Sequence, residues 1–317
     1  MTRKLALIPF AVFLSLGLVL PTFALEKLKL GASVKVYPAH YLPALTAEDK
    51  GFWKENGLDV EWVPVGSDAA EMRAVAAGAL NIGMATSAGI ITAAGGGLPV
   101  VMVNELVSSV SWKLWVRADS PYRNVLDLKN KRIGVTALGG ITHAFGRIVA
   151  KAHGIENDLR FVGAGGARQN VAGLWAGSFD ASILGMASAA RLKVEGKIRE
   201  ISSARDYLPK PWFDDAIFAR KNFAQTKPDE VRRVIKATLQ ATDFIQRNPR
   251  WTIDKMVSFT GIPEEAAKLL YDDTKFTANG HLDRKAVENI RDVLIRYGII
   301  NEKAPAADDL FTNAYLP

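Results

Sequence analysis

A glycine-rich turn ahead of a helix is the feature of this sequence best suited to binding an anion. The turn consists of Gly139, Gly140, Ile141, Thr142 and His143, and helical spacing continues from it to residue 152. Unpaired backbone N–H groups at a helix N-terminus, together with the positive end of the helix dipole, attract negative charge. We therefore expect the N–H groups of this turn, with one hydroxyl from Thr142, to hold the acidic end of a ligand.

Ser87 occupies a comparable position, between a predicted strand over residues 81–85 and a predicted helix over residues 88–94. We expect it to be the N-cap, where a hydroxyl accepts a hydrogen bond from the first helical turn. Two roles are open for it: a plain cap, or a cap that also contacts a ligand. The matching loop in the second half of the chain contains Gly185 and Met186, which we include as candidate ligand contacts.

Four aromatic residues outside these turns are further candidates for ligand contact: His40, Tyr41, Trp112 and Trp212. Aromatic rings form the flat, apolar walls of small-molecule sites, and these three residue types also carry hydrogen-bonding groups. A position in the hydrophobic core is the alternative interpretation for each of them.

The sequence carries no catalytic motif that we can identify. The absence of cysteine excludes a thiol nucleophile, a thiolate metal site and a disulfide. No G-x-S-x-G elbow, Walker loop or H-E-x-x-H is present, and the four histidines lack metal-ligand spacing. Residues 163–168 begin like a dinucleotide fingerprint, but Arg168 stands where the last glycine belongs. We therefore expect no enzyme activity, no metal and no cofactor.

An internal near-repeat indicates how the candidate loops are positioned. Residues 59–84 match residues 158–183 in pattern at a constant offset of 99, and each copy predicts a strand, a helix and a strand. Gly78 and Gly177 follow the two helices, where a left-handed C-cap is expected. A further strand precedes each copy, at Gly31 in the first half and Gly134 in the second.

The alternation of strands and helices predicts an α/β protein with two lobes, each a mostly parallel sheet flanked by helices. Ligands bind such sheets at the carboxyl ends of the strands. Four loops should converge in a cleft between the lobes: residues 37–43, 85–88, 138–143 and 185–188. We predict that lobe 1 comprises residues 25–112 and 213–317, and that lobe 2 comprises residues 113–212.

Two crossings between the lobes are expected at residues 111–117 and 212–223, both rich in aromatics. From about Thr226 the chain reads as helices, and the last of them should begin near Asp283. Its predicted buried residues are Val287, Ile290, Leu294 and Tyr297. We expect these C-terminal helices to pack on lobe 1.

The N-terminus predicts a secretory signal peptide. A basic start precedes an apolar run over residues 5–20, and small side chains follow at Thr22 and Ala24. We expect residues 1–24 to be removed and the mature chain to begin at Leu25 in the periplasm. An uncleaved membrane anchor is the alternative, but the run is shorter than the ~20 residues that a spanning helix needs.

The composition is that of a folded protein without nucleic-acid character. The 317 residues are 49% hydrophobic and 23% charged, and this length suits two domains. The formal net charge of +7 is mild and spread along the chain, with no basic run that interleaves aromatics. This charge favours anionic small molecules over nucleic acid as partners.

Several segments resemble one known family. The segments are Tyr37 to Pro43, Glu48 to Val60, the alanine-rich helix before Asn81, and Asp127 to Val135. They resemble the substrate-binding proteins of ABC importers for sulfonate, nitrate, taurine and thiamine precursors, the NMT1/THI5-like group. The resemblance implies a type II periplasmic binding protein that captures a solute by hinge closure and delivers it to a membrane permease.

The same resemblance leaves the ligand open. In this family a glycine followed by one or two hydroxyl residues grips the acidic group of the ligand, and here Gly140 or Ile141 stands where one hydroxyl is expected. A carboxylate, a sulfonate and a neutral heterocycle are all retained as ligands, and a monomer is expected. Relatives that make a pyrimidine precursor carry a cysteine-rich motif that this chain lacks. A periplasmic enzyme acting on a small acid and a solute receptor for a membrane sensor remain alternatives.

Overall fold

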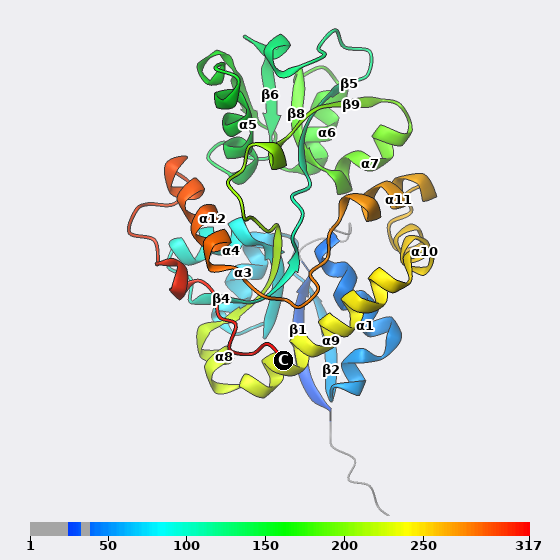
Figure 1. Cartoon of the computed structure of the whole chain (residues 1–317), viewed down its shortest axis with the longest axis vertical. Coiled ribbons are helices and arrows are strands. Elements are labelled where there is room, and N and C mark those ends of the chain that lie inside the picture. The colour runs from blue at the N-terminus through cyan, green and yellow to red at the C-terminus, as the bar shows by residue number, and fades with distance from the viewer. Residues whose placement is uncertain (1–24, 33–38) are drawn as a thin grey trace, which may run out of the picture.

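The computed structural model describes residues 25–32 and 39–317, so the predicted signal peptide and the start of the loop at residues 37–43 lie outside it. Two five-stranded sheets form two lobes, one below and one above in Figure 1. The lower sheet has the order β2-β1-β3-β10-β4 and the upper sheet β7-β6-β8-β5-β9. No helix in the described part of the chain is long and apolar enough to cross a membrane.

The strands of the lower sheet are β1 (Glu26–Ala32), β2 (Leu58–Pro64), β3 (Ile82–Thr86), β4 (Val100–Val107) and β10 (Asp215–Arg220). Those of the upper sheet are β5 (Trp112–Arg117), β6 (Arg132–Val135), β7 (Arg160–Gly163), β8 (Ala181–Gly185) and β9 (Ile198–Ser203).

Four strands of each sheet run in one direction, which confirms the mostly parallel two-lobed α/β fold. The exceptions are β10, antiparallel to β3 and β4, and β5, antiparallel to β8 and β9. Each exception is the first strand after the chain crosses between the lobes. The segments expected as crossings therefore consist largely of sheet strands, and the passage itself is shorter.

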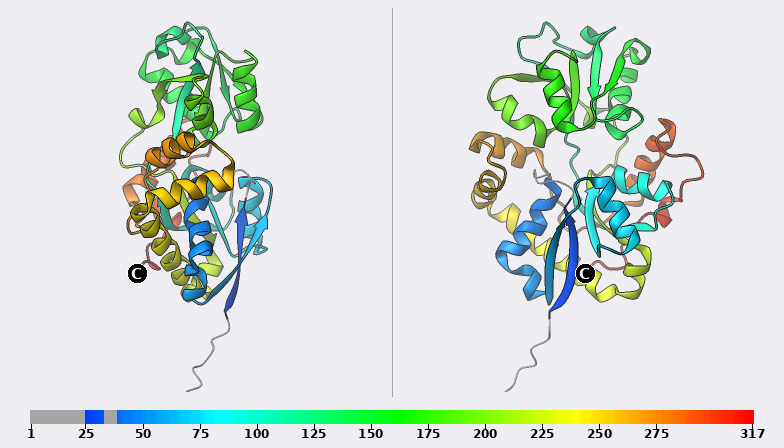
Figure 2. Two further views of the ribbon diagram at one scale, coloured as in Figure 1. Left: turned by 90° about the vertical axis from the view of Figure 1, so that its right-hand side faces the viewer. Right: turned by 180° about the vertical axis from the view of Figure 1, so that it is seen from behind.

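The helices flank the sheets on both faces (Figure 2). In chain order they are α1 (Leu42–Lys50), α2 (Phe52–Glu55), α3 (Asp68–Ala77), α4 (Ser87–Gly95), α5 (Ile141–Ala152), α6 (Ala167–Trp175), α7 (Met186–Val194), α8 (Lys221–Thr226), α9 (Pro228–Arg247), α10 (Pro249–Thr260), α11 (Glu264–Asp273) and α12 (Arg284–Arg296). A short 3-10 helix, η1 (Ala39–Tyr41), precedes α1.

The near-repeat is confirmed by the element boundaries. Helices α3 and α6, strands β3 and β8, and helices α4 and α7 each begin 99 residues apart. Gly78 and Gly177 both have positive φ, 78° and 71°, as expected for glycines that end helices. The two lobes are therefore built on one plan, and their loops occupy equivalent places.

The C-terminal helices were expected to pack on lobe 1, but not all of them do. Helix α9 packs on α1 and α2, whereas α11 packs on α7 and α12 also contacts α5, both in the upper lobe. Tyr297 follows the end of α12 and is only partly buried, with the guanidinium of Arg147 4.8 Å from its ring centroid. Helical spacing identifies which face of a helix is buried but not the lobe that buries it.

Candidate ligand site

The residues at the end of β3 bond to the segment that leads from the upper lobe back into β10. Thr86, and not Ser87, is the N-cap of α4, because its Oγ1 accepts a hydrogen bond from Gly89 N (3.2 Å). The N-cap prediction was therefore wrong by one residue. Ser87 is buried, its Oγ donates to Phe213 O (2.8 Å), and its N donates to Asp214 O (2.7 Å). The Ser87 hydroxyl thus ties α4 to the segment that returns from the upper lobe.

His40 and Tyr41 are both buried in η1, which leads directly into α1. His40 Nδ1 lies 3.0 Å from Asp215 Oδ1. Burial disfavours the imidazolium, but the adjacent carboxylate outweighs it and raises the pKa of His40 above its ordinary 6.5. Within the described residues, His40 Nε2 has no hydrogen-bond partner although it is buried. That nitrogen is available to a ligand.

Two acidic residues that the sequence analysis did not single out complete this group. Asp214 accepts a hydrogen bond from Ser111 N (3.4 Å) and another from the Trp112 side chain. Burial and the adjacent Asp215 carboxylate raise its pKa well above 3.8. We refer to His40, Asp214 and Asp215 as the acidic cluster. The available sequence indication was an Asp-Asp pair directly after aromatic residues in a predicted crossing.

The tryptophans and the upper-lobe loops meet at the passage between the lobes. Trp112 and Trp212 both pack on Phe145, with ring centroids 6.1 Å apart in each case. Ile141 is partly buried against the same apolar cluster. A Cβ on Gly185 would lie 3.2 Å from Ser111 Oγ and 3.8 Å from the Trp112 ring, so glycine permits this close approach.

The predicted anion turn begins α5. Gly140 is its N-cap, in an extended conformation without a side-chain cap, and the preceding Gly139 has a φ of 74°. Gly139 N donates to His143 Nδ1 (3.0 Å), while burial and Arg147 lower the pKa of His143. The imidazole is therefore neutral and accepts through Nδ1.

The hydroxyl of Thr142, expected to contact the ligand, is already hydrogen-bonded within the protein. The side chain is buried, its Oγ1 accepts from Thr136 N (3.0 Å), and it lies 2.8 Å from Thr136 Oγ1. Thr136, which follows β6 and is half-buried, is therefore a hydroxyl at this turn that sequence analysis missed. Its position directly after a parallel strand was the available indication.

The equivalent helices of the two lobes begin differently. Ser67 and Thr86 cap α3 and α4 through their side chains, whereas Gly166 and Gly185 stand at the matching positions of α6 and α7. With Gly140 at α5, all three of these upper-lobe helices have glycine N-caps and no side-chain cap. Their first N–H groups are thus open to other acceptors.

Met186 lies at the start of α7 but its side chain is 0% exposed. It belongs to the same apolar cluster as Ala267 and Leu270 of α11. The structure therefore places this candidate in the packing between α7 and the C-terminal region.

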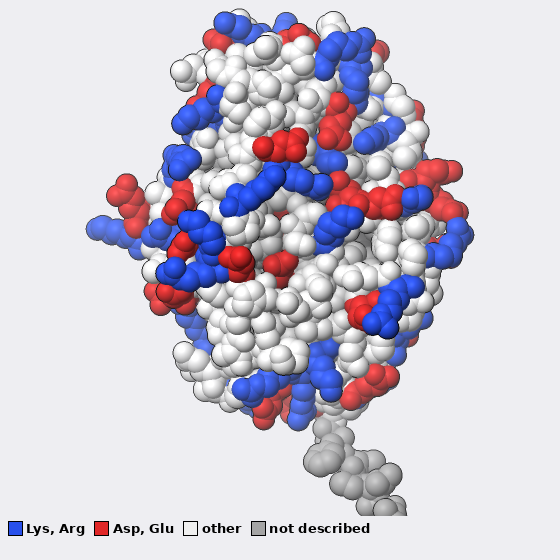
Figure 3. All heavy atoms as spheres, in the orientation of Figure 1, with Lys and Arg blue, Asp and Glu red and all other residues white. Residues whose placement is uncertain are grey.

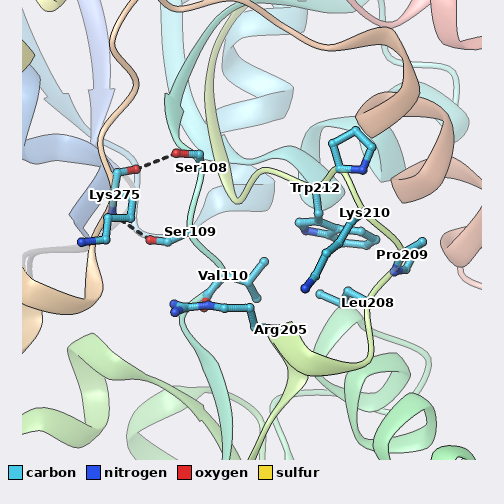
Figure 4. Close-up of a pocket in the computed structure, with 10 residues that line it drawn as sticks. Ser108, Ser109, Val110, Arg205, Leu208, Pro209, Lys210, Trp212 and Lys275 are labelled. Atoms are coloured by element: carbon cyan, nitrogen blue, oxygen red, sulfur yellow. Dashed lines mark hydrogen bonds between the residues drawn. The ribbon is translucent and has the colours of Figure 1, made fainter.

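A pocket of about 360 Å³ lies at the passage between the lobes (Figure 4). Its lining residues are Ser108, Ser109, Val110, Arg205, Leu208, Pro209, Lys210, Pro211, Trp212 and Lys275. Lys210 extends into the pocket, and the guanidinium of Arg205 lies at its edge, where Nη2 donates to Val110 O (2.8 Å). Basic and acidic side chains lie together across the middle of this face of the molecule (Figure 3). Trp212 is the only predicted site residue in this lining.

Comparison with known proteins identifies the relatives of this chain. Residues 39–251 match the family model described as NMT1/THI5 like. A putative thiamine biosynthesis protein of Haemophilus influenzae is 26% identical over 305 residues, 92% of this chain and 93% of the relative. The taurine-binding periplasmic protein of Escherichia coli is 26% identical over 232 residues, 70% of this chain and 71% of the relative. A putative binding protein of Brucella abortus is 26% identical over 222 residues, and the match spans 67% of this chain and 66% of the relative.

Solved structures share the fold. The alkanesulfonate-binding protein SsuA of Xanthomonas axonopodis pv. citri, bound to MOPS, has a TM-score of 0.75 at 16% identity, covering 91% of this chain and 99% of SsuA. A Candida albicans protein described as having the generic periplasmic binding protein fold has a TM-score of 0.76 at 17% identity, covering 92% and 98%. The desulfurization enzyme DSZB also matches, with a TM-score of 0.67 at 16% identity, covering 92% and 97%. At these identities the likeness establishes the periplasmic binding protein fold.

Proposed function

This chain belongs to the NMT1/THI5-like family, and from that premise we propose that it is the solute-binding component of an ABC importer. It captures a small organic molecule between its lobes by hinge closure and delivers that molecule to a membrane permease. A ligand that contacts both lobes only in the closed form shifts the equilibrium toward closure by its difference in affinity for the two forms. The names of the taurine-binding and alkanesulfonate-binding relatives support this role.

The single observation that carries the proposal is the opposed chemistry of the two lobes. The upper lobe offers uncapped helix N-termini at Gly140 and Gly185, which suit an acidic group. The lower lobe offers the acidic cluster, whose carboxyl oxygens suit a hydrogen-bond donor of the ligand. A sulfonate or carboxylate that also carries an amino group satisfies both, as taurine does, and so does a heterocycle with an amino group and an acidic substituent.

The proposed lobes and location follow from the same premise. We propose that lobe 1 comprises residues 25–112 and 213–317 and that lobe 2 comprises residues 113–212. The membership of the two sheets supports this division except at Trp112, where β5 of the upper sheet begins. We propose that residues 1–24 are a signal peptide, that the mature protein is periplasmic and that it acts as a monomer.

Binding without turnover is part of the proposal. The match to DSZB supports keeping a periplasmic enzyme as the second candidate, because the same fold serves that enzyme. The binding role is favoured because the Brucella, taurine-binding and alkanesulfonate-binding relatives are named as binding proteins. The site residues that the structure describes also include no nucleophile beside a base. The two candidates differ in whether a bound compound is recovered unchanged.

A thermal-shift screen with mass spectrometry tests the proposal. Methanesulfonate, taurine, acetate and an aminopyrimidine carboxylate form the panel. A true ligand at a hundredfold excess over its Kd should stabilise the protein by about 2.7 kcal/mol and should be recovered unchanged. Conversion of a bound compound would favour the enzyme. Failure of every panel compound to stabilise the protein would contradict the ligand class.

A further inference from the structure

Glu71 is a buried acid that the candidate site has not used. It lies on α3, is 0% exposed, and its Oε2 accepts a hydrogen bond from Tyr41 Oη (2.8 Å). Its Oε1 accepts a second hydrogen bond from Met84 N of β3 (2.8 Å). One carboxylate therefore holds both a strand of the lower sheet and the segment that leads into α1.

The carboxylate lies where the pairing between β1 and β3 is interrupted. Among the described residues these two strands pair only at Leu30 and Ile82. Met84 N, further along β3, donates to Glu71. Glycines at both strands make room: a Cβ on Gly31 would lie 2.6 Å from Glu71 Cγ, and one on Gly83 would lie 2.8 Å from Glu71 Oε1. Glu71 thus lies beside the end of β1 and bonds to Tyr41 of η1. Residues 39–43 are the described part of the predicted ligand-binding loop at residues 37–43, and we refer to these five residues as the loop.

The other lobe shows that this position does not need a charge. Asn170 stands 99 residues after Glu71, is also 0% exposed, and donates Nδ2 to Ile183 O (3.0 Å) and Gly134 O (3.4 Å). A neutral amide therefore fills the same gap in the upper sheet. The lower lobe thus has an ionisable side chain where the upper lobe has an amide. Glu71 also bonds to the side chain of Tyr41, whereas Asn170 bonds to backbone carbonyls.

We propose that Glu71 is a positioning residue for the ligand-binding loop: in its ionised form it holds Tyr41 and the adjacent His40 in place, and ligand affinity follows its ionisation. This inference rests on the proposed function only for its affinity readout. The ionised carboxylate accepts charge-assisted hydrogen bonds from both donors, and these weaken when a proton neutralises it. The loop is then held less firmly, and the ligand must order it on binding.

The surroundings of Glu71 set the pH range. Burial raises its pKa from 4.5 to about 7, against the hydrogen bonds from Met84 and Tyr41, which lower it. The facing charged groups are His40 on η1, which favours ionisation, and Asp68 on α3, which opposes it. Asp215 of β10 forms an ion pair with His40, and the ring of Phe218 of β10 lies beside Gly83, as Glu71 does. Loop order and affinity should therefore increase between about pH 6 and about pH 8.

The test compares wild type with Glu71→Gln and with a matched control, Glu105→Gln. Burial also raises the pKa of Glu105 to about 7, but Glu105 lies on β4 and its charged neighbour is Asp283. Hydrogen exchange of residues 39–50, corrected for intrinsic rates, is measured without ligand at about pH 6 and about pH 8. Calorimetry with taurine, or with the panel compound of largest thermal shift, gives the affinity at the same pH values.

Wild type and Glu105→Gln should gain protection of residues 39–50, and bind roughly tenfold more tightly, at the higher pH. Glu71→Gln should behave at both pH values like wild type at the lower one. If Glu71→Gln keeps the pH-dependent protection, or matches wild type at the higher pH, the proposal is overturned. Because the exchange measurement uses no ligand, a panel that fails to bind contradicts the proposed function without removing this test.

Stability and loop protection, measured together, separate a positioning role from a purely structural one, because the two should change in opposite directions with pH. A carboxyl whose pKa is raised in the folded state loses stability as pH increases from its ordinary value through the raised one. As pH increases, Glu71→Gln should therefore become more stable relative to wild type. At the higher pH its loop should be less protected than the loop of wild type. Tyr41→Phe provides a second variant if Glu71→Gln does not fold, and should reduce the protection at the higher pH only. A Tyr41→Phe protein with unchanged protection would overturn the proposal.

Discussion

The hydroxyl groups of Ser87 and Thr142 are engaged within the protein. Ser87 Oγ donates to Phe213 O, and Thr142 Oγ1 accepts from Thr136 N and bonds to Thr136 Oγ1. Side chains committed in this way fix the backbone around them, so the groups left for an anion are backbone N–H groups. In the proposed site the anion therefore binds to backbone N–H groups at the start of α5, where Gly140 is the N-cap and no side chain caps the helix.

Replacing Gly140 by Asp separates folding from binding. Its φ of −94° is open to any residue, and Asp is a favourable N-cap, so the free energy of unfolding should be unchanged or a few tenths of a kcal/mol higher. Binding of a sulfonate or carboxylate should weaken more than tenfold, because the new carboxylate would face the ligand's own charge. Gly140→Asn, a cap without charge, is the control.

Calorimetry on both variants, after circular dichroism confirms folding, decides the point. The Asn variant should keep most of the affinity that the Asp variant loses. Undiminished affinity in a folded Gly140→Asp protein would show that the acidic group does not bind at this helix terminus, and the anchor would then be sought at Ser87 and the segment around His40 and Tyr41.

At the scale of helices and strands, the repeat shows one scaffold with two kinds of helix start. The lower lobe caps α3 and α4 with hydroxyl side chains, and the upper lobe leaves glycine at each equivalent position. Helix α12 has no counterpart in the repeat and follows the usual rule. Asp283 caps it by accepting from Lys285 N (2.6 Å) and Ala286 N (3.1 Å).

Asp283→Ala should therefore destabilise the protein by about 1 kcal/mol, within the range of 0.5–2 kcal/mol measured for such caps. Urea unfolding monitored by circular dichroism gives the value. Asp308→Ala is the matched control, since Asp308 meets the first turn of α12 only through an exposed ion pair with Arg284. The two variants should not be equally destabilised; if they are, the cap is not the cause.

In the whole molecule, the lobes are joined by more than the two passages of the chain. Helix α11 packs on α7, and α12 contacts α5, so the C-terminal region bridges both lobes (Figure 1). One apolar cluster contains both Leu184 of the upper sheet and Leu30 of the lower sheet. Hinge motion must therefore preserve or exchange these contacts.

Met186→Ala tests whether this residue serves packing or ligand contact. A fully buried Met in the cluster with α11 should cost about 2–5 kcal/mol of stability when truncated. Val194→Ala on the same helix, where the side chain is 39% exposed, should change stability little. Urea unfolding and calorimetry together give the answer. Loss of affinity without loss of stability would restore Met186 as a ligand contact.

The sequence alone determined the alternation of strands and helices, the 99-residue repeat, the glycine turns and the start of the last helix near Asp283. These features depend on residues a few positions apart, and local spacing records such relations directly. The two-lobed fold followed from the same alternation, because parallel strands require crossover helices.

Only the tertiary structure decided which polar groups meet. His40 and Asp215 are 175 positions apart, and Glu71 reaches Tyr41 across a gap that two glycines create. The packing of α11 on α7 and the burial of Met186 depend likewise on distant segments. Periodicity shows that a face is buried, but the partner of that face, and the charge balance of a buried cluster, arise from contacts that no local pattern encodes.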